Sequence, residues 1–379
     1  MIQLNELTLV CFCHLRWNFV YQRPQHLMSR FANIMRVVFI EEPVRDCSSP
    51  FFSVSQESEN HWLIVPHLPE SMPDVEVQSR QRTFISKFLA ALNIDHYCLW
   101  LYSPMALLIS DHLKPDLLVY DCMDELSLFK FAPSQLKELE HQLFECADLV
   151  FTGGHSLYAA KKHLHSNIHP FPSSIDYSHF SQAQSKQPDP GDQVNIPHPR
   201  FGYHGVIDER MDLGYIETIA RMRPHWQFIF LGPVVKIDEK SLPEMPNLHF
   251  LGMKDYQQLP QYLSGWDVAI MPFALNDSTR FISPTKTPEY LAAGKPVIST
   301  PINDVIRHYG EVVYIAATPE SFVRIVENGV DMSAQWRSKV KRLLKQNSWD
   351  ITWASMTELM KTTLMQKIDR ENYRRQEYV

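Results

Sequence analysis

Lys286 and Glu289 stand three residues apart in the segment SPTKTPEYLAAGKPVIST. Thr287 suits an N-cap and Pro288 suits the first helical position, because proline lacks the N–H that would stay unpaired there. Gly294 suits a left-handed C-terminal cap, and the VIST run after it is typical of a buried strand. The segment therefore predicts a short helix before a strand, with a lysine and a glutamate at the helix N-terminus.

A helix N-terminus favours anions such as phosphate, because its N–H groups are unpaired and carry partial positive charge. Arg210, in the turn GYHGVIDERMDLG after a predicted strand, is a second cation, and a guanidinium can bind phosphate oxygens in pairs. Gly205 in this turn allows close approach of the backbone. Paired with Lys286, Arg210 points to a diphosphate site. In the competing interpretation Glu289 offsets the helix dipole, and both cations are solvated surface charges.

Length and composition indicate a globular protein of two domains. The chain has 379 residues, more than one typical core, and its apolar share of 45% is normal for a soluble protein. A net charge of −7 argues against a general nucleic-acid binder. The N-terminal MIQLNELTLVCFCHLRW has no basic n-region, and no apolar run is long enough to span a membrane. The six cysteines include no CxxC pair, which favours free thiols in the cytoplasm.

Short apolar runs alternate with helical stretches along the whole chain. In the first half the predicted strands are LTLVCF, VVFI, WLIV, YCLWL, LLVY, DLVFT and IHPF. In the second half they are FGYHG, FIFL, LHFL, VAIM, PVIS and VVYI. This βα alternation predicts α/β architecture, with two Rossmann-like domains built on parallel sheets. The predicted ranges are 1–180 for the first domain, 181–200 for a polar, proline-rich linker, 201–348 for the second domain and 349–379 for a C-terminal helix.

The C-terminal stretch NSWDITWASMTELMKTTL has one apolar helical face, which predicts core packing. The residues of this face are Trp349, Trp353, Met356, Met360 and Leu364. The preceding RSKVKRLLKQ is strongly basic. It is typical of a solvated helix face, and the alternative is contact with an anionic membrane surface.

The sequence lacks the motifs that are typical of nicotinamide-cofactor sites and of metal sites. No GxGxxG follows a predicted strand, so a nicotinamide dehydrogenase is disfavoured. No His, Cys or Asp spacing suggests a metal-ligand set. We therefore expect a site that holds neither a metal nor a bound cofactor.

Several of these segments together resemble a known family. GYHGVIDERMDLG, FIFLGPV, MPNLHFLGMKDYQQLPQYLSGWDVAIMPF, SPTKTPEYLAAGKPVIST and NSWDITW resemble the sugar-nucleotide-binding half of retaining GT-B glycosyltransferases of family 4, also called group 1. WNFVYQRPQHLMSRFA, YDCMDELSLF, LEHQLFECADLVFTGGHSLY and PSSIDYSHF are similar to a bacterial subgroup. The resemblance implies a GT-B fold, in which two Rossmann-like domains face each other across a cleft and the last helix crosses back to the first domain.

The resemblance also implies roles for the residues around the predicted helix. Glu289 would accept hydrogen bonds from the ribose hydroxyls of a UDP-, GDP- or ADP-sugar. Arg210 and Lys286 would hold the diphosphate, and its phosphate would take the acceptor proton as the glycosidic bond breaks. The other candidates for donor binding are Gly205, Pro284, Thr285, Thr279 and Asp277.

One position departs from the family pattern. The family has a second glutamate eight residues before the ribose-binding one, in contact with the donor sugar, and this chain has Phe281 there. Asp277, Ser278 and Thr279 form a polar loop nearby and are the candidates to take its place.

The first domain is expected to bind the acceptor. Arg23 precedes a helix that should begin at Pro24 and would face the cleft, together with Trp17. The alternative is that Trp17 only packs and Arg23 forms a local salt bridge. Asp124 lies where relatives place a polar residue near the reacting sugar carbon, although a helix-capping role competes with this. His155 in TGGHS is a further acceptor-side candidate.

Three functions are compatible with these residues. The favoured one is a retaining glycosyltransferase of polysaccharide biosynthesis, with a glycan, a lipid-linked glycan or a small molecule as acceptor. The alternatives are a nucleotide-sugar epimerase of the same fold and a non-catalytic module that binds nucleotide-sugars. We expect a cytoplasmic location with contact to the inner membrane face through the basic C-terminal helices, and no nucleic-acid partner.

Overall fold

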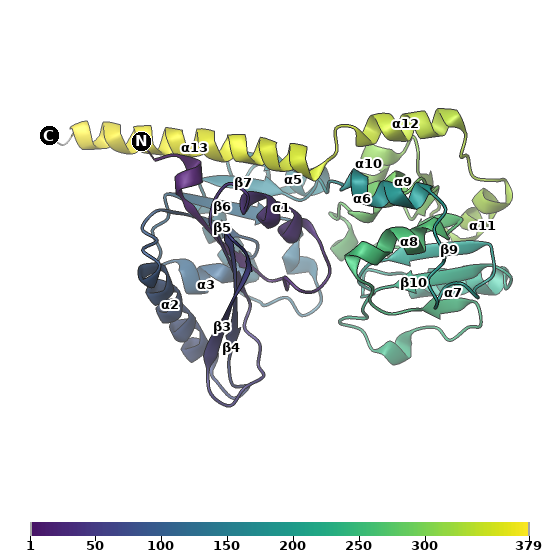
Figure 1. Ribbon diagram of the computed structural model, residues 1–379, viewed down its shortest axis with the longest axis horizontal. Helices are drawn as coiled ribbons and strands as arrows, with labels where there is room; N and C mark the ends of the chain where they lie inside the picture. Colours follow the sequence, from purple (N-terminus) through teal and green to yellow (C-terminus); the bar gives the residue numbers. More distant parts are fainter. Residues whose placement is uncertain (1, 378–379) are drawn as a thin grey trace.

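The computed structural model describes residues 2–377, with side chains up to residue 373, as two α/β domains side by side along the long axis (Figure 1). The first domain is built on an eight-stranded sheet. Its strands, in spatial order, are β3 (Phe51–Ser58), β4 (His61–His67), β2 (Val37–Glu41), β1 (Thr8–Cys13), β5 (Tyr97–Leu101), β6 (Leu117–Cys122), β7 (Leu149–Thr152) and β8 (Ile168–Pro170). Its helices are α1 (Arg23–Phe31), α2 (Asp74–Ala91), α3 (Leu107–Ser110), α4 (Leu136–Cys146) and α5 (His155–Lys161).

The strands of this sheet follow the predicted apolar runs with one addition. All neighbours are parallel except β3, which pairs antiparallel with β4 at the sheet edge. The sequence FFSVSQES of β3 is exposed over most of its length. The strand was missed because an exposed edge strand has no continuous apolar run to mark it.

Strand β1 shows how the sheet is covered on both faces. Leu9, Cys11 and Cys13 belong to a core that includes α1. Val10 and Phe12 belong to a second core with α2 and α4 on the other face. Successive side chains of a strand point to opposite faces, so a strand between two helix layers is apolar throughout.

The second domain has a six-stranded parallel sheet. Its strands, in spatial order, are β11 (Leu248–Phe250), β10 (Gln227–Leu231), β9 (Arg200–His204), β12 (Val268–Met271), β13 (Val297–Ser299) and β14 (Tyr314–Ile315). Its helices are α7 (Leu213–Met222), α8 (Leu259–Ser264), α9 (Lys286–Ala292), α10 (Asn303–Tyr309), α11 (Pro319–Glu327) and α12 (Ala334–Leu344).

The segment predicted as a linker, residues 181–200, is packed on the second domain. Helix α6 (Tyr177–Phe180) precedes it, and Phe180, Ala183 and Ile196 are part of the second domain's core. The Gln193 side chain is fully buried and hydrogen-bonds the Tyr262 carbonyl and the Trp266 indole N–H. Polar side chains thus order this segment, so its low apolar content did not indicate a free linker.

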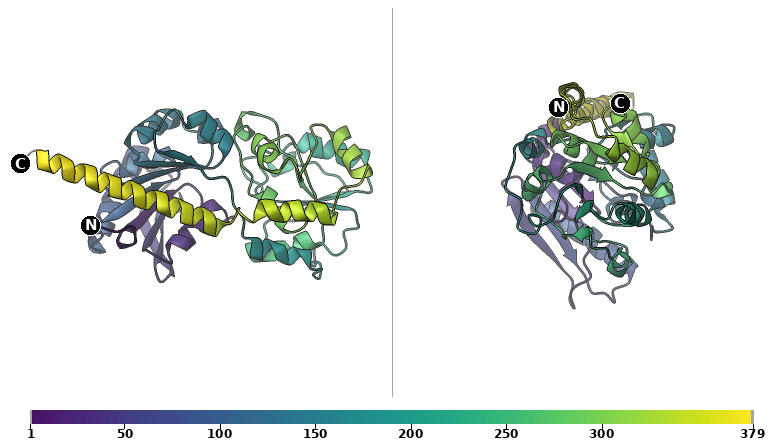
Figure 2. Two further views of the ribbon diagram at one scale, coloured as in Figure 1. Left: turned by 90° about the horizontal axis from the view of Figure 1, so that it is seen from above. Right: turned by 90° about the vertical axis from the view of Figure 1, so that its right-hand side faces the viewer.

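Helix α13 (Trp349–Glu377) lies along the first domain, whereas α12 just before it lies on the second (Figure 2). Trp349, Met356, Met360 and Leu364 are buried in the core that also contains α1. The helix that closes the chain therefore ties the second domain to the first. No helix within residues 2–377 is long and apolar enough to cross a membrane.

Asp304 at the start of α10 forms a direct contact between the domains. Its carboxylate accepts hydrogen bonds from the backbone N–H groups of His155 and Ser156, at 2.9 and 3.0 Å, and from the Ser156 hydroxyl. A Cβ on Gly154 would lie 2.4 Å from Asp304 Oδ2. The second glycine of TGGHS therefore makes room for a carboxylate that caps α5 from the other domain.

Candidate active site

Helix α9 begins two residues earlier than the sequence predicted. Its first residue is Lys286 and its N-cap position is Thr285, so Thr287 and Pro288 lie within the first turn. Proline fits there because the N–H groups of a first turn have no partner inside the helix. The Thr287 side chain is fully buried, and its hydroxyl lies 3.3 Å from the Met271 sulfur. Gly294 has φ +72°, as its C-terminal position requires.

Lys286 extends from this helix across the end of β9. A Cβ on Gly205 would lie 2.5 Å from Lys286 Cε, and Gly205 itself has φ +137°. The φ value favours glycine at this position, and a Cβ there would also require the Lys286 side chain to shift. Burial lowers the pKa of Lys286, and the nearby Glu289 opposes that shift.

Two adjoining cavities open on Lys286, which lines both. The larger has a volume of about 320 Å³ and includes Gly205, Thr285 and Glu289 in its wall. The smaller has a volume of about 80 Å³ and is lined by predicted residues from both domains. These are Arg23 and Asp124 from the first domain, and Arg210, Pro284, Thr285 and Lys286 from the second.

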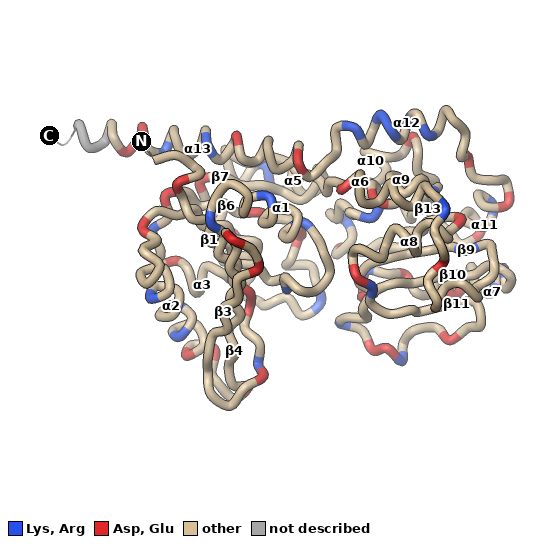
Figure 3. The backbone as a smooth tube through the Cα atoms, in the orientation of Figure 1, with Lys and Arg blue, Asp and Glu red and all other residues tan. Residues whose placement is uncertain are grey.

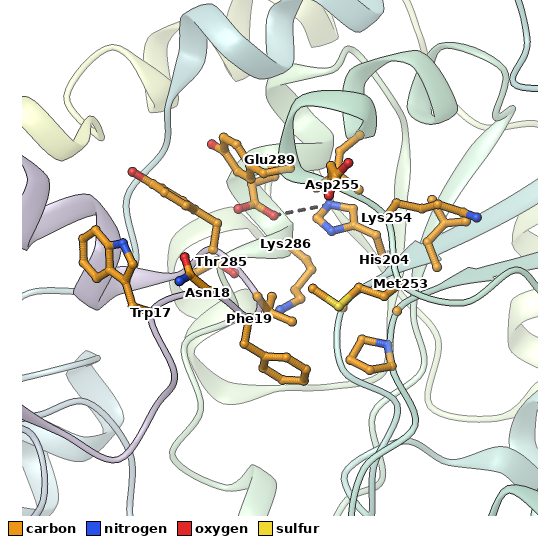
Figure 4. Close-up of a pocket in the computed structure, with 18 residues that line it drawn as sticks. Trp17, Asn18, Phe19, His204, Met253, Lys254, Asp255, Thr285, Lys286 and Glu289 are labelled. Carbon is orange, nitrogen blue, oxygen red and sulfur yellow. Dashed lines mark ion pairs between the residues drawn. The ribbon is translucent and has the colours of Figure 1, made fainter. Parts of the chain in front are cut away.

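Glu289 faces His204 inside the larger cavity (Figure 4). Glu289 Oε2 lies 3.3 Å from His204 Nε2, and both side chains are 7% exposed. Burial raises the pKa of Glu289 to about 8, although Lys286 acts in the opposite direction. Burial also lowers the pKa of His204 well below its usual value. The site therefore holds a desolvated carboxyl group that a ligand with hydroxyl donors could satisfy.

Arg210 is held in place by Asp208. Its Nε and Nη2 atoms donate to the Asp208 carboxylate at 2.7 to 3.0 Å, and its guanidinium lies 5.4 Å from the ring centre of Phe129 in the first domain. Asp124 faces this cation across the cleft. Burial raises the pKa of Asp124, and the charges of Arg210 and Lys286 lower it. Asp124 does not cap the following 3-10 helix, whose N-cap is Glu125.

The first-domain candidates Arg23 and Trp17 are largely engaged within their own domain. Arg23 is the first residue of α1, one position before the predicted start, and is buried. Its guanidinium donates two hydrogen bonds to Asp121, at 2.8 and 2.9 Å, and one to the Phe171 carbonyl. Trp17 packs edge-on against His61 and Phe39, and also lines the larger cavity.

Three other candidates, Thr279, Asp277 and His155, lie outside both cavities, and so does Phe281, which stands where the family has its first glutamate. The Thr279 hydroxyl bonds the backbone of its own loop at Ala274, and Asp277 is exposed. His155 lies at the domain contact, 4.7 Å from the ring of His308. Phe281 packs against an apolar core of the first domain. Thr279 and Asp277 therefore line neither cavity.

Trp17 is the one residue of the first-domain loop closing the larger cavity that the sequence marked as a candidate. Residues 17–21 all line this cavity, and Tyr21 lies 4.7 Å from the ring of Tyr256 in the second domain. Only the folded arrangement brings this loop to the cavity. His204 was missed, although a titratable residue beside Gly205 at a strand end was a usable signal.

The first domain has a cavity of its own, of about 270 Å³, where β1, β2 and β5 end. It is lined mainly by apolar side chains, with His14 and Glu42 among the polar ones. Gln81 also lines it, is 3% exposed, and its carbonyl oxygen has no hydrogen-bond partner among the described residues. Strand ends on either side of a central strand are a common place for ligands in α/β domains.

We searched the described residues for metal-binding clusters and for disulfide bonds. Within it, no group of three or more His, Cys, Asp or Glu residues is placed to hold a metal ion. All six cysteines are free.

Comparison with known proteins gives the same picture of the second domain and of the whole fold. Residues 199–331 match the family "Glycosyl transferases group 1". The chain is 24% identical over 299 residues to the Bacillus subtilis protein described as "Putative teichuronic acid biosynthesis glycosyltransferase TuaH", covering 73% of this chain and 74% of that protein.

Two solved structures share the fold. Sucrose-phosphate synthase from Thermosynechococcus elongatus superposes with a TM-score of 0.69 at 14% identity, over 93% of this chain and 98% of that one. HepE from Anabaena, in complex with UDP and glucose, superposes with a TM-score of 0.65 at 13% identity, over the same shares of the two chains. The predicted GT-B fold is confirmed.

Proposed function

We propose that this chain, a glycosyltransferase with a group 1 domain on a GT-B fold, transfers a sugar from a nucleoside-diphosphate donor to a hydroxyl acceptor with retention of configuration. The observation that carries this proposal is the placement of Glu289, Lys286 and Arg210 around two adjoining cavities between the domains. A carboxylate suits a ribose diol and two cations suit a diphosphate. UDP is the proposed nucleotide, because HepE was solved with UDP and glucose.

The residues of the smaller cavity support a step without a protein nucleophile. The acceptor hydroxyl attacks the anomeric carbon on the face from which the diphosphate leaves. The bond between that carbon and the phosphate oxygen breaks, its electron pair stays on the diphosphate, and the acceptor proton moves to the diphosphate. Lys286 and Arg210 stabilise the charge that builds there, more in the transition state than in the ground state. Asp124, which lines the same cavity, would stabilise positive charge on the sugar.

The acceptor is proposed to bind to the first domain, with Arg23, Trp17 and His155 remaining candidates on that side. The cavity lined by Gln81 and Glu42 is the pocket in this domain that supports the proposal. The similarity to a teichuronic acid biosynthesis protein supports a growing polysaccharide, free or lipid-linked, as the acceptor class.

A cytoplasmic location at the inner membrane face is also proposed. The free cysteines support a reducing compartment. Basic residues recur along α12 and just past its end (Figure 3). Among them, Arg337, Lys341 and Lys345 are exposed and follow one another at intervals of four residues. Such a stripe suits anionic headgroups.

The test is proton NMR of the protein with UDP-glucose and no acceptor. A retaining transferase that uses water as a slow acceptor releases α-glucose first, before mutarotation mixes the anomers. First release of β-glucose would contradict retention. A new nucleotide-sugar without hydrolysis would instead indicate an epimerase, and binding without any turnover across UDP-, GDP- and ADP-sugars would indicate a non-catalytic module.

A further inference from the structure

His204 and Glu289 each leave a buried polar atom unpaired at the same place in the larger cavity. His204 Nε2 and Glu289 Oε2 lie 3.3 Å apart (Figure 4), and neither atom has a hydrogen-bond partner among the residues whose side chains are described. A buried polar atom without a partner costs about 1–3 kcal/mol. The two atoms are therefore each other's nearest partner, and a proton between them would satisfy both.

Packing holds the His204 ring in this orientation. It lies parallel to Phe180, with ring centres 5.9 Å apart, and edge-on to Tyr290 at 5.0 Å. The Tyr290 hydroxyl also accepts a hydrogen bond from the His204 backbone N–H at 2.9 Å. The imidazole thus has little freedom to turn away from Glu289.

Few other titratable groups face the pair. The charge of Lys286 lowers the pKa values of both Glu289 and His204, and the charge of His179 lowers the pKa of His204 further. Three tyrosines are close enough for the Glu289 charge to raise their pKa values further. These groups are Lys286 and Tyr290 from α9, His179 from α6, Tyr203 from β9 and Tyr256 from the 3-10 helix Tyr256–Gln258.

We propose that His204 is a positioning residue for nucleotide capture, whose Nε2–H donates to Glu289 Oε2 and orients the carboxylate that forms when the ribose diol binds. The proposal rests on the proposed function, because it needs Glu289 to be the ribose acceptor. A diol brings two O–H donors, and a protonated carboxyl group cannot accept both as well as a carboxylate can. Binding of a ribonucleotide should therefore release the proton that the free pair holds, to the buffer.

The size of the effect follows from the ionisation of the pair. With a Glu289 pKa of about 8, the ionised fraction rises from about one tenth at pH 7 to about nine tenths at pH 9. The affinity for UDP should rise about tenfold over this range relative to 2′-deoxy-UDP, which lacks one of the two hydroxyls. The comparison with 2′-deoxy-UDP cancels the titration of Lys286, because both ligands carry the same diphosphate.

The experiment is calorimetric titration of the full chain with UDP and with 2′-deoxy-UDP at pH 7, 8 and 9, in two buffers of different ionisation enthalpy. UDP should release close to one proton more than 2′-deoxy-UDP at pH 7, and the two ligands should release nearly the same number at pH 9. His204→Phe keeps the ring volume without the donor, and should weaken UDP about tenfold at pH 7 with little effect on 2′-deoxy-UDP. His204→Gln keeps an N–H donor and should restore most of the affinity. His249→Phe, outside the cavity, is the matched control.

In the unmodified protein, the proposal would be overturned if the ratio of the affinities for UDP and 2′-deoxy-UDP did not change with pH. This measurement does not depend on the folding of any variant. A His204→Phe protein with unchanged UDP affinity at pH 7 would also overturn the proposal. Failure of the proposed function has a different signature, in which no nucleoside diphosphate binds or Glu289→Ala leaves UDP binding unchanged.

Discussion

Asp304 is 1% exposed and caps α5 of the first domain from α10 of the second, through two backbone N–H groups and the Ser156 hydroxyl. Replacing it by alanine removes hydrogen bonds to a charged acceptor, each of which contributes about 1.5–3 kcal/mol. Two backbone N–H groups would also lose their partner. Water can reach them when the domains separate, so we count only the two backbone hydrogen bonds, each at the lower end of this range, which gives a loss of about 3 kcal/mol. The equilibrium constant between the state in which α10 contacts the first turn of α5 and the state in which this contact is open should fall about 100-fold.

Hydrogen exchange measured by mass spectrometry on a peptide spanning residues 153–161 tests this prediction. In Asp304→Ala the amides of His155 and Ser156 should exchange roughly 100-fold faster than in the unmodified protein. Asp304→Asn retains an oxygen acceptor and should be intermediate. Glu311→Ala is the control, since Glu311 is 67% exposed and pairs only with the exposed Arg342. Unchanged exchange at the start of α5 in Asp304→Ala would refute the inferred role of this contact.

Three further predictions concern Glu289, Lys161 and α12. Burial raises the pKa of Glu289 to about 8, so the stability that its protonated form contributes at low pH is lost as the pH rises through that value. The melting temperature of Glu289→Gln should therefore rise relative to the unmodified protein between pH 5 and 9, and a difference independent of pH would contradict this. Lys161 is buried, and its Nζ lies 2.7 Å from a Glu125 carboxylate oxygen and 2.6 Å from a Glu140 carboxylate oxygen. Lys161→Met should lower the free energy of unfolding, measured in urea, by about 3–5 kcal/mol, because it leaves the two carboxylates without their cation. A loss below about 1 kcal/mol would contradict this. The unmodified protein should sediment with anionic vesicles, and the double variant Arg337→Glu/Lys341→Glu on α12 should not. Arg221→Glu on α7 is the control and should still sediment with them. Equal vesicle binding by the double variant and the control would contradict membrane contact through α12.

The fold could be predicted largely from local patterns. Continuous apolar runs marked the buried parallel strands, because such strands are covered on both faces. The edge strand β3 and the ordered segment 181–200 lack that signal and were not recognised, the first because it is exposed and the second because polar side chains such as Gln193 order it.

The sequence indicated the candidate site mainly within the second domain's segments, and Arg23, Trp17 and Asp124 are the first-domain candidates that also line its cavities. Lys286, Glu289 and Gly205 come from two strand ends of one sheet, and they line the larger cavity together. Other features of the site depend on contacts between segments that are distant in the sequence, which one sequence does not specify. These features are the position of residues 17–21 at the larger cavity, the proximity of Asp124 to Arg210 and the pairing of His204 with Glu289. Thr279 illustrates the reverse case, because its hydroxyl is used by its own loop.

Calorimetric titration of UDP into the full chain tests the assignment of the donor site. We expect UDP to bind, and Glu289→Ala and Lys286→Ala each to weaken binding by at least about 1.4 kcal/mol, a tenfold change in Kd. Asp277→Ala, in an exposed loop outside both cavities, should leave the affinity unchanged. Absence of UDP binding, or equal binding by all three variants, would contradict the assignment of the donor site.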